Sequence, residues 1–379
     1  MPEEKKDSLP LAQNEFKKIA IIYLLYYHNQ SYIDDMVSAL KRMTYPKDKI
    51  ELVIVSNPHP VEGSFVRYLE ETVVPLSGKE IPHVTILSQN ENLGFAGGNN
   101  VGTEWAIQNN FDYVYYHNND GFFASNALEP LVQAFENDEK IGIAQSLIML
   151  YPETELINSA GNDFHYLGFG FCHGYREKIQ NVKLPAIAEV NYASGAGMMV
   201  KVDLIKKFGM WNKDFFMYHE DLEWCLRLRI AGYKIKIVRD SIFYHKYQFG
   251  RSVDKFFFME RNRHAVMLMF FRWPTLLLLF PIGIILEFGL WLFSIKNGYV
   301  KKRVEVYKYW LKWSNWQLWL KKRKYIQSIR QVSDRYLLKH TVSGINFQEK
   351  EVESGLVKYV ANPIMGLYYW LIVRIFIFW

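Results

Sequence analysis

Apolar runs alternate with mixed polar and apolar stretches from the N-terminus to the middle of the chain. Runs that fit β-strands occupy residues 19–26, 50–55, 84–87, 113–117 and 141–144. Stretches that suit helices lie between them, at residues 32–43, 101–108 and 128–135. Strands and helices that alternate in this way predict an open parallel α/β sheet. In such sheets, ligands bind beyond the carboxyl ends of the strands.

Polar residues follow several of the expected strands and should therefore meet at one edge of the sheet. They are Tyr27, His28, Asn29, Ser56, Asn57, Asn118, Asn119 and Asp120. Taken alone, the segment from Asn118 to Gly121 is most simply a turn, because Asn, Asp and Gly favour turns. Its functional interpretation is that Asp120 binds a divalent cation, which would neutralise a diphosphate leaving group.

Three glycines, Gly94, Gly97 and Gly98, lie just before the helix expected from residue 101. Glycines that open a helix leave backbone amides free to approach a diphosphate or a ribose. The spacing is neither that of a GxGxxG motif nor that of a P-loop. A flexible loop is therefore the simpler interpretation of this segment.

The stretch from Tyr192 to His245 contains a further expected helix. Its apolar positions recur near the helical period at Leu222, Cys225, Leu226 and Ile230. Glu220 and Asp221 fall in its first turn, where the helix dipole favours ionised carboxylates. An ionised carboxylate at the lip of a cleft can act as a general base towards a hydroxyl group. The alternative is that the pair serves only as N-terminal helix electrostatics.

Composition narrows the possible classes of protein. The 379 residues allow about two domains, and half of them are hydrophobic. The two cysteines, Cys172 and Cys225, form no CxxC or Cys/His cluster, which argues against a disulfide framework and a structural zinc site and fits a reducing compartment. Because residues 1–14 are polar and charged, we expect no secretory signal.

The C-terminal region begins with an apolar stretch at residues 274–293, about as long as the ~20 residues that a transmembrane helix needs. Pro281 and Glu287 interrupt it, and basic residues flank it on both sides. Because positive charge on both sides gives no orientation, a spanning helix and an in-plane helix both stay open.

A basic stretch follows, with eleven Lys or Arg against one acid between residues 296 and 330. Within it, tryptophans recur every three residues at Trp310, Trp313, Trp316 and Trp319. A basic, Trp-rich helix suits the headgroup region of a membrane, and an aromatic stripe in a protein core is the alternative. The last residues, 363–379, are again apolar and aromatic and are expected to dip into the same surface.

In order and spacing, these motifs resemble glycosyltransferase family 2, and within it the rhamnosyltransferase-like inverting enzymes with a GT-A fold. The resemblance covers about residues 18 to 265. Tyr27-His28-Asn29 stands where the family has Thr-Tyr-Asn, and Asn92-Leu-Gly-Phe-Ala-Gly-Gly-Asn-Asn100 matches its donor-side motif. Asn118-Asn119-Asp120 occupies the place of the Asp-x-Asp metal motif, and Gly209 to Arg227 resembles the acceptor-side motif.

The resemblance implies a role for each matching residue. Asp221 would be the catalytic base, Asp120 and His245 would hold Mg²⁺ or Mn²⁺, and Trp211 and Glu220 would lie on the acceptor side. The implied donor-binding residues are Tyr27, His28, Asn29, Asn57, Asn92, Gly94, Gly98, Asn99, Asn118, Asn119 and Asp120. The expected fold is α/β: a GT-A domain over residues 15–265, Rossmann-like, with a mostly parallel sheet and helices on both faces. A helical membrane-association region would follow at residues 266–379.

Two positions depart from the family's pattern. The second expected strand ends in Val55-Ser56-Asn57, where the family usually has Val-Asp-Asn, and the missing Asp leaves the nucleotide preference open. Asn118 stands where the first Asp of the metal motif often lies, so Asp120 is the only carboxylate of that motif.

We therefore expect transfer of a sugar from a nucleotide-sugar to a glycan or lipid-linked acceptor, in cell-surface polysaccharide synthesis at the cytoplasmic face of the cell membrane. Rhamnose from a dTDP donor is the candidate that the family favours. One alternative is a catalytically weakened, membrane-bound nucleotide-sugar-binding or scaffold protein. Another is a nucleotidyltransferase, but the segment from Tyr27 to Ser31 lacks the Gly-rich, Arg-containing loop that such an enzyme needs. Nucleic acid is not an expected partner, because tryptophans interrupt the basic stretch and no reader motif lies beside it.

Overall fold

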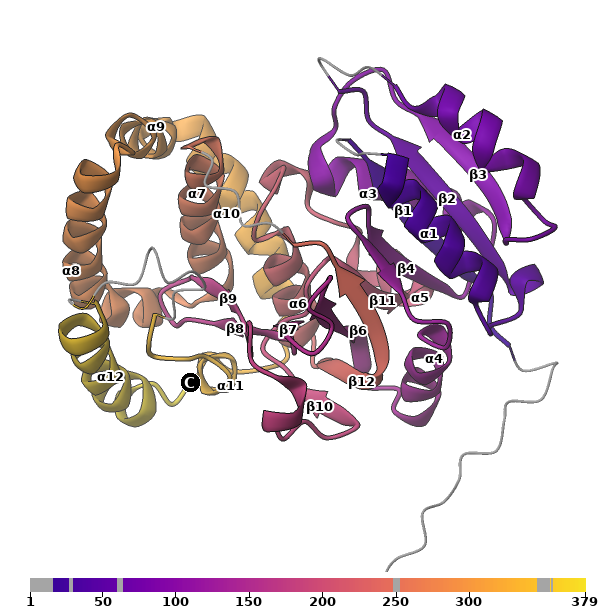
Figure 1. Ribbon diagram of the computed structural model, residues 1–379. Coiled ribbons are helices and arrows are strands. Elements are labelled where there is room, and N and C mark those ends of the chain that lie inside the picture. Colours follow the sequence, from indigo (N-terminus) through magenta and orange to yellow (C-terminus); the bar gives the residue numbers. More distant parts are fainter. Residues whose placement is uncertain (1–15, 27–29, 60–63, 248–252, 346–354, 356) are drawn as a thin grey trace, which may run out of the picture.

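The computed structural model describes residues 16–26, 30–59, 64–247, 253–345, 355 and 357–379. A sheet with helices on both faces forms the N-terminal part of the protein, and the C-terminal helices lie beside it (Figure 1). The strands of the main sheet are β1 Ile19–Leu25, β2 Ile50–Ser56, β3 His83–Ser88, β4 Tyr113–Asn118, β5 Gly121–Phe123, β6 Ile141–Leu150, β7 Ile157–Ser159, β10 Ile187–Glu189, β11 Gly197–Lys201 and β12 Lys234–His245. A separate hairpin consists of β8 Asn162–Phe164 and β9 Gly170–Cys172.

The strands of the main sheet follow the order β10-β12-β6-β11-β4-β1-β2-β3, with β5 paired to β12 and β7 to β6. β1 pairs in parallel with β2 and β4, and β2 with β3, as the alternation of strands and helices predicted. β11 runs antiparallel between β4 and β6, so the sheet is mixed. The carboxyl ends of β1, β2 and β4 therefore lie at one edge, where ligands bind in sheets of this kind.

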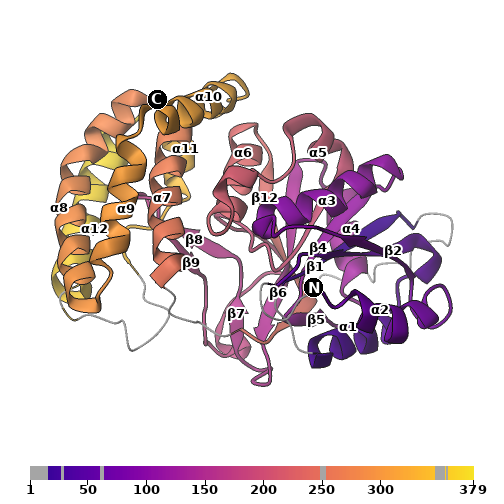
Figure 2. The ribbon, with the colours of Figure 1, turned by 90° about the horizontal axis from the view of Figure 1, so that it is seen from above.

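Both faces of the sheet are apolar, because the central strands are apolar runs and their side chains point alternately to opposite sides. Ile22 of β1 belongs to a hydrophobic cluster with α3 Gly94–Gln108, α5 Val202–Phe208 and α6 Glu220–Ile230. Ile21 belongs to a second cluster with α1 Gln30–Arg42, α2 Val66–Thr72 and α4 Leu128–Asn137. Figure 2 shows α3, α5 and α6 on one side of the sheet and α1 and α2 on the other.

The glycine-rich segment is the start of a helix and not a flexible loop. α3 begins at Gly94 rather than near residue 101. A Cβ atom at Gly98 would lie 2.4 Å from Leu24 Cδ1, and one at Gly102 would lie 2.7 Å from Ile22 Cγ2. The missing side chains let α3 lie close against β1, and this packing accounts for Gly98 without any ligand.

The C-terminal helices pack onto the α6 side of the sheet. They are α7 Val253–Phe270, α8 Trp273–Asn297, α9 Val300–Leu311, α10 Trp313–Ser328, α11 Asp334–Lys339, α12 Asn362–Tyr368 and a π-helix Tyr369–Phe376. One hydrophobic cluster contains side chains of both parts, among them Phe215 and Trp319, whose ring centroids are 5.3 Å apart. Because α7 crosses residue 265 and the core is continuous, the division into two domains at this residue stays a prediction.

α8 exposes one apolar face and turns its acidic residue inward. The side chains of Leu277, Phe280 and Phe288 are 73%, 63% and 67% exposed. Glu287 instead forms ion pairs with Arg263 of α7 and Arg303 of α9. Arg263 and Arg303 both also pair with Glu260, at 3.0 and 3.1 Å. The residue that interrupts the apolar run is thus part of a largely buried ion-pair cluster of Glu260, Arg263, Glu287 and Arg303.

The four regularly spaced tryptophans do not form one membrane-facing stripe. The helix breaks at Lys312, between α9 and α10. Trp310 packs against Trp316 and Trp319, with ring centroids 5.4 and 6.4 Å apart, while Trp313 is 66% exposed. The expectation of a headgroup-binding helix is therefore wrong for three of the tryptophans, which contribute to the protein core.

The C-terminal segment lies against α8. Tyr368 Oη donates a hydrogen bond to the carbonyl of Leu278, and Trp379 Nε1 donates one to Thr275 Oγ1 at 2.9 Å. Trp370 is exposed in this segment, as are Ile375 and Phe378. Exposed apolar side chains therefore occur on two neighbouring elements, α8 and the helices at the C-terminus (Figure 1).

Candidate active site

The register of a short antiparallel pair brings the two predicted metal ligands together. β4 ends at Asn118, and β5 begins at Gly121, which lies opposite His245 at the end of β12. His245 Nε2 is consequently 2.8 Å from Asp120 Oδ1 and 3.2 Å from Asn118 Nδ2. Asn118 Nδ2 also donates to Asp120 Oδ1 at 2.7 Å. The segment that most simply suggested a turn is thus one wall of a polar cluster at the sheet edge.

Asn158 of β7 orients the imidazole of His245. His245 Nδ1 lies 2.8 Å from Asn158 Oδ1, which only accepts, so Nδ1 carries a proton and this hydrogen bond turns Nε2 towards Asp120. Burial alone would raise the pKa of Asp120, but the nearby His245 outweighs burial and lowers that pKa. An ionised carboxylate beside an imidazole nitrogen suits a divalent cation such as Mn²⁺ or Mg²⁺. Within the described ranges no three His, Cys, Asp or Glu side chains converge on a possible metal site, and binding of a cation by Asp120 and His245 stays a prediction.

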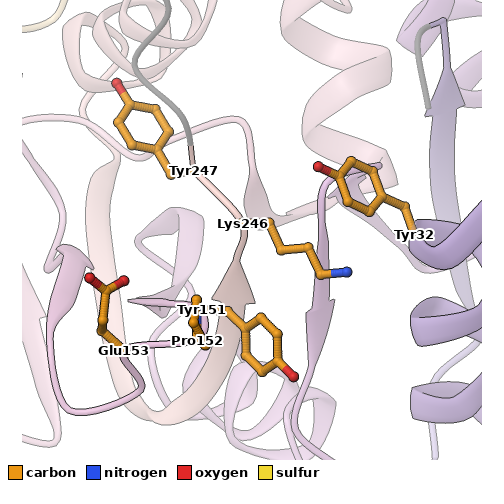
Figure 3. A pocket seen from close by; sticks show the side chains of 6 residues that line it. All are labelled: Tyr32, Tyr151, Pro152, Glu153, Lys246 and Tyr247. Carbon is orange, nitrogen blue, oxygen red and sulfur yellow. The ribbon is translucent and has the colours of Figure 1, made fainter. Parts of the chain in front are cut away.

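A pocket of about 380 Å³ opens directly beside this pair (Figure 3). It is lined by Tyr32, Tyr151, Pro152, Glu153, Lys246 and Tyr247. Backbone hydrogen bonds join it to the metal-site residues, from Lys246 N to Asp120 O at 2.8 Å and from Tyr151 N to His245 O at 3.0 Å. The Lys246 side chain extends towards α1, where it pairs with Asp35 and lies 4.6 Å from the ring centroid of Tyr32.

Asp221 reaches the same sheet edge through the segment that precedes β11. Its Oδ2 accepts a hydrogen bond from Gly195 N at 3.4 Å, and its Oδ1 accepts one from Leu222 N at 2.7 Å. The next residue, Ala196, accepts a hydrogen bond from Asn118 N at 3.0 Å. The predicted base and the predicted metal motif are therefore hydrogen-bonded to two consecutive residues, Gly195 and Ala196.

Burial changes the ionisation of the acidic pair. It raises the pKa of Asp221 to about 6, although the hydrogen bonds from Leu222 and Gly195 act in the opposite direction. Burial, together with the adjacent Asp221, raises the pKa of Glu220 well above its usual range. Glu220 Oε2 has no hydrogen-bond partner among the described residues. Simple N-terminal electrostatics would favour ionised carboxylates in this turn, whereas burial acts in the opposite direction on both residues. Their catalytic and acceptor-side roles stay predictions.

The loop before α6 holds unusual backbone conformations. Phe216, Tyr218 and His219 all have left-handed φ angles, of 64°, 64° and 66°. Such conformations cost about 1–3 kcal/mol each for residues other than glycine and persist where the surroundings enforce them. Phe216 O accepts a hydrogen bond from Phe95 N of α3 at 3.0 Å. The loop thus joins the predicted donor side to the helix that carries Asp221.

The donor-side residues meet where β2 ends and α3 begins. Asn57 Nδ2 lies 3.3 Å from Asn92 Oδ1 and 3.4 Å from Gly94 O, and Gly94 N donates to Asn92 Oδ1 at 2.9 Å. Asn57 is 2% exposed, and its Oδ1 has no partner in the described part of the chain. A Cβ atom at Gly94 would lie 2.7 Å from Phe216 Cδ2, so this glycine is needed where α3 meets the loop.

Other predicted site residues have structural roles of their own. Asn99 is buried and its Nδ2 donates to Phe95 O at 3.0 Å within α3. Trp211 is buried against Trp224, with ring centroids 4.7 Å apart. Asn119 O accepts a hydrogen bond from Tyr23 Oη at 3.1 Å. Contact of these three residues with a substrate stays a prediction.

Tyr27, His28 and Asn29, which were also predicted to bind the donor, lie outside the described residues.

Arg227 pairs with Glu223 one helical turn earlier, with Arg227 Nε 3.1 Å from Glu223 Oε1 in the buried interior. Gln145 and Asn158 are site residues that the sequence did not suggest. Gln145 Oε1 accepts from Ser194 N at 2.7 Å and so supports the Gly195 segment. Gln145 lies on β6, where the sequence predicted only an apolar strand, and Asn158 lies on β7, a strand that was not predicted. The spacing of these polar residues in the sequence did not indicate a role in the site.

Comparison with known proteins shows the family and the fold of this chain. The family model described as glycosyltransferase like family 2 matches residues 25–267, more than half of the chain. This chain belongs to that family. Two curated relatives of the family 2 chain are the dTDP-rhamnosyl transferase RfbF of Shigella flexneri and the low-salt glycan biosynthesis hexosyltransferase Agl10 of Haloferax volcanii.

RfbF is 22% identical over 174 residues, which cover 45% of this chain and 54% of the relative. Agl10 is 26% identical over 141 residues, which cover 36% of this chain and 44% of the relative. The family 2 chain therefore spans about half the length of these relatives. Among solved structures, it resembles GalNAc-T7 with UDP, GalNAc and Mn²⁺ at a TM-score of 0.52 and 14% identity, covering 68% of this chain and 48% of that one. This likeness supports the GT-A fold that was expected from the motifs.

Proposed function

We propose that this protein is an inverting glycosyltransferase that moves a sugar from a nucleotide-sugar to a hydroxyl of a glycan or lipid-linked acceptor. The observation that carries the proposal is that Asp221 and the Asn118–Asp120 motif are hydrogen-bonded to two consecutive residues, Gly195 and Ala196. A base and a diphosphate-binding group must lie on opposite sides of one anomeric carbon for a single displacement. Their common attachment at one sheet edge supports the proposal that these residues serve as that pair.

In the proposed reaction, Asp221 takes the proton from the acceptor hydroxyl as its oxygen attacks the anomeric carbon. The new carbon–oxygen bond forms as the bond to the nucleoside diphosphate breaks, and the configuration inverts. A general base works best when its pKa lies near the working pH, and burial places the pKa of Asp221 at about 6. Base assistance of this kind contributes on the order of 10²–10⁴-fold to the rate.

Asp120 and His245 are the residues that would hold a divalent cation. Their oxygen and nitrogen atoms, 2.8 Å apart, and the hydrogen bond that orients His245 fit this use. When bound, Mn²⁺ or Mg²⁺ would neutralise charge that develops on the departing diphosphate. The presence of Mn²⁺ with UDP in the GalNAc-T7 structure supports the same role here.

The donor sugar is proposed from the relatives. RfbF is named for dTDP-rhamnose transfer and Agl10 for hexose transfer, so a deoxyhexose or hexose donor is proposed, with dTDP-rhamnose tested first. Cell-surface polysaccharide synthesis is the process that we propose for this transfer. Ser56 stands where the family usually places an acidic residue, so several nucleotides belong in the test.

We further propose that the C-terminal helices hold the enzyme on the cytoplasmic face of a membrane. α8 is long and apolar enough to cross a bilayer, with a mean hydropathy of 2.3 over its most apolar window. Its exposed face suits the apolar interior of a lipid surface, whereas its inner face is occupied by the ion-pair cluster. A helix that lies in the plane of the membrane surface places its exposed face against lipid and keeps its inner face against the protein. Residues 266–379 would then form a membrane-association region that follows a catalytic region at residues 15–265.

The test of the activity is a donor panel of dTDP-rhamnose and common UDP-, GDP- and dTDP-hexoses with purified protein in detergent and Mn²⁺. Asp221→Asn should lower turnover on the order of 10²–10⁴-fold. Its matched control is Asp203→Asn, which removes an exposed first-turn carboxylate from α5. Turnover by Asp221→Asn near that of the wild type would contradict the base assignment. Donor binding without turnover of any donor would instead favour the scaffold function.

A further inference from the structure

The loop that precedes α6 directs several carbonyl groups towards α7. It runs from Asp214 to His219 and includes three residues with left-handed backbone. Several of its amide groups make short-range bonds, such as Met217 N to Phe215 O at 2.8 Å. A strained loop of this kind keeps its shape only if neighbouring elements enforce it.

Asn262 of α7 provides that restraint. Its Nδ2 lies within hydrogen-bond distance of three carbonyls of the loop, at 3.1 Å from Phe215 O, 2.9 Å from Met217 O and 2.7 Å from Tyr218 O. The side chain is fully buried, so water does not compete for these bonds. One amide group therefore fixes the backbone on both sides of Tyr218, a residue with a left-handed φ angle.

Arg261 fixes the orientation of this amide. Its Nε donates to Asn262 Oδ1 at 2.8 Å, so the Nδ2 group must point towards the loop. Its Nη2 donates to Asp214 O at 2.9 Å and to Phe215 O at 2.8 Å. The guanidinium group lies 5.1 Å from the ring centroid of Phe258 and 5.4 Å from that of Tyr309. Asn262 and Arg261 thus act as a pair of donors to the carbonyls of Asp214, Phe215, Met217 and Tyr218.

The restrained loop contacts both halves of the candidate site. Phe216 O accepts from Phe95 N on the donor side, at 3.0 Å. His219 Nε2 contacts Gly168 O at 3.0 Å, and His219 O accepts from Glu223 N in the first turn of α6. A shift of the loop would therefore displace the start of the helix that presents Asp221.

We propose that Asn262, oriented by Arg261, is a positioning residue for glycosyl transfer: it holds the 214–219 loop in the conformation that presents Asp221 and the acceptor-side surface. The proposal rests on the proposed transferase function. Asn262 makes no contact with Asp221 and takes no proton in the reaction. Its loss should therefore act on the use of the acceptor and on the chemical step, and leave binding of the nucleotide intact.

The test compares Asn262→Ala and Asn262→Asp with Gln327→Ala. The aspartate variant keeps the acceptor atom for Arg261 but lacks the N–H donors. Gln327 is a matched control, because its amide donates to the carbonyls of Met269 and Phe270 at the far end of α7 and does not contact the loop. Three sets of measurements are made: the Kd for UDP and dTDP with Mn²⁺, kcat and acceptor KM with the donor that the wild type uses, and hydrogen exchange of peptides that cover residues 213–223.

Both Asn262 variants should lower kcat/KM for the acceptor on the order of 100-fold, since small displacements of a catalytic group have effects of this size. They should leave the nucleotide Kd unchanged and speed hydrogen exchange in residues 213–223. Gln327→Ala should change neither the activity nor the exchange of this segment. Unchanged exchange of this segment in Asn262→Ala would overturn the proposal, as would an equal loss of activity in Gln327→Ala. If the wild type transfers no sugar, the proposed transferase function is wrong. Hydrogen exchange needs no turnover, so it still shows whether Asn262 restrains the loop.

Discussion

Two influences of opposite sign act on the carboxyl group of Asp221. Its position in the first turn of α6 favours the ionised form through the helix dipole, which is the effect that the sequence pattern predicted. Burial acts in the other direction because a buried charge loses its hydration, and it prevails, with a pKa of about 6. The same competition leaves the more deeply buried Glu220 with a pKa well above its usual range.

A pH dependence follows from this shift. We expect kcat/KM for transfer to rise with pH up to about 6, as Asp221 loses its proton, and to level off above that pH. The sign for stability is opposite. Since folding raises this pKa, the stabilising contribution of the group is complete below its unfolded value near 3.8 and is lost as the pH rises through about 6. A pH–rate profile together with unfolding at each pH checks both, and an acidic limb near 4 would contradict the assignment.

Removal of the cation or of one ligand gives a second prediction at this scale. His245→Ala and Asp120→Ala should both weaken the binding of Mn²⁺, and transfer should fall to near background with either variant or with a chelator. Removing Asn158, which only orients His245, should cost on the order of 10–100-fold in metal affinity. Calorimetric titration with Mn²⁺ measures these affinities. Equal affinity in the wild type and in His245→Ala would rule out this site.

The predicted residues differ in how far local pattern could place them. Asp120 and His245 are 125 positions apart. The alternation of elements placed Asp120 at the sheet edge, whereas the pairing with His245 was implied by the resemblance to the family. Asn262 and Asn158 could not be foreseen, because their roles depend on hydrogen bonds to backbone that is remote in sequence. No periodicity or spacing marks such contacts.

At the scale of elements, the start of α3 is a feature that the sequence pattern did not predict. Glycine lowers helix propensity, and the segment from Gly94 to Gly98 therefore suggested a loop. Close packing against β1 compensates for that low propensity, since α3 approaches the sheet more closely than a helix with side chains at these positions could. The central strands β1, β2 and β6 were easier to predict, because burial on both faces makes each of them an apolar run.

Substitution of two glycines tests this explanation. Gly98→Ala would place a Cβ atom 2.4 Å from Leu24 Cδ1 and should destabilise the protein by about 1–3 kcal/mol. Gly289→Ala in α8, where nothing lies within 4 Å of the new atom, should stabilise it by about 0.5–1 kcal/mol. Chemical unfolding in detergent measures both. A Gly98→Ala protein as stable as the wild type would show that α3 can move away from the sheet.

For the whole molecule, the apolar faces of α8 and of the C-terminal segment determine where the protein should reside. Loss of two exposed aromatic side chains, as in Phe280→Ser with Phe288→Ser, should weaken binding to vesicles of anionic and neutral lipid about tenfold or more. Val74→Ser removes an exposed apolar side chain from the sheet part and should have no effect. Vesicle flotation compares the variants. Equal flotation of the double variant and the wild type would exclude α8 as the contact surface.

The ion-pair cluster of Glu260, Arg263, Glu287 and Arg303 has a consequence for how the protein should respond to ionic strength. Arg263 and Arg303 are buried and already neutralised, so they are not available to anionic headgroups. Dissolved salt screens exposed charges over a Debye length of about 10 Å at 0.1 M but has little effect on buried pairs. Concentrated salt should therefore release only the share of vesicle adhesion that surface lysines provide, and α8 should remain seated on α7 and α9 throughout.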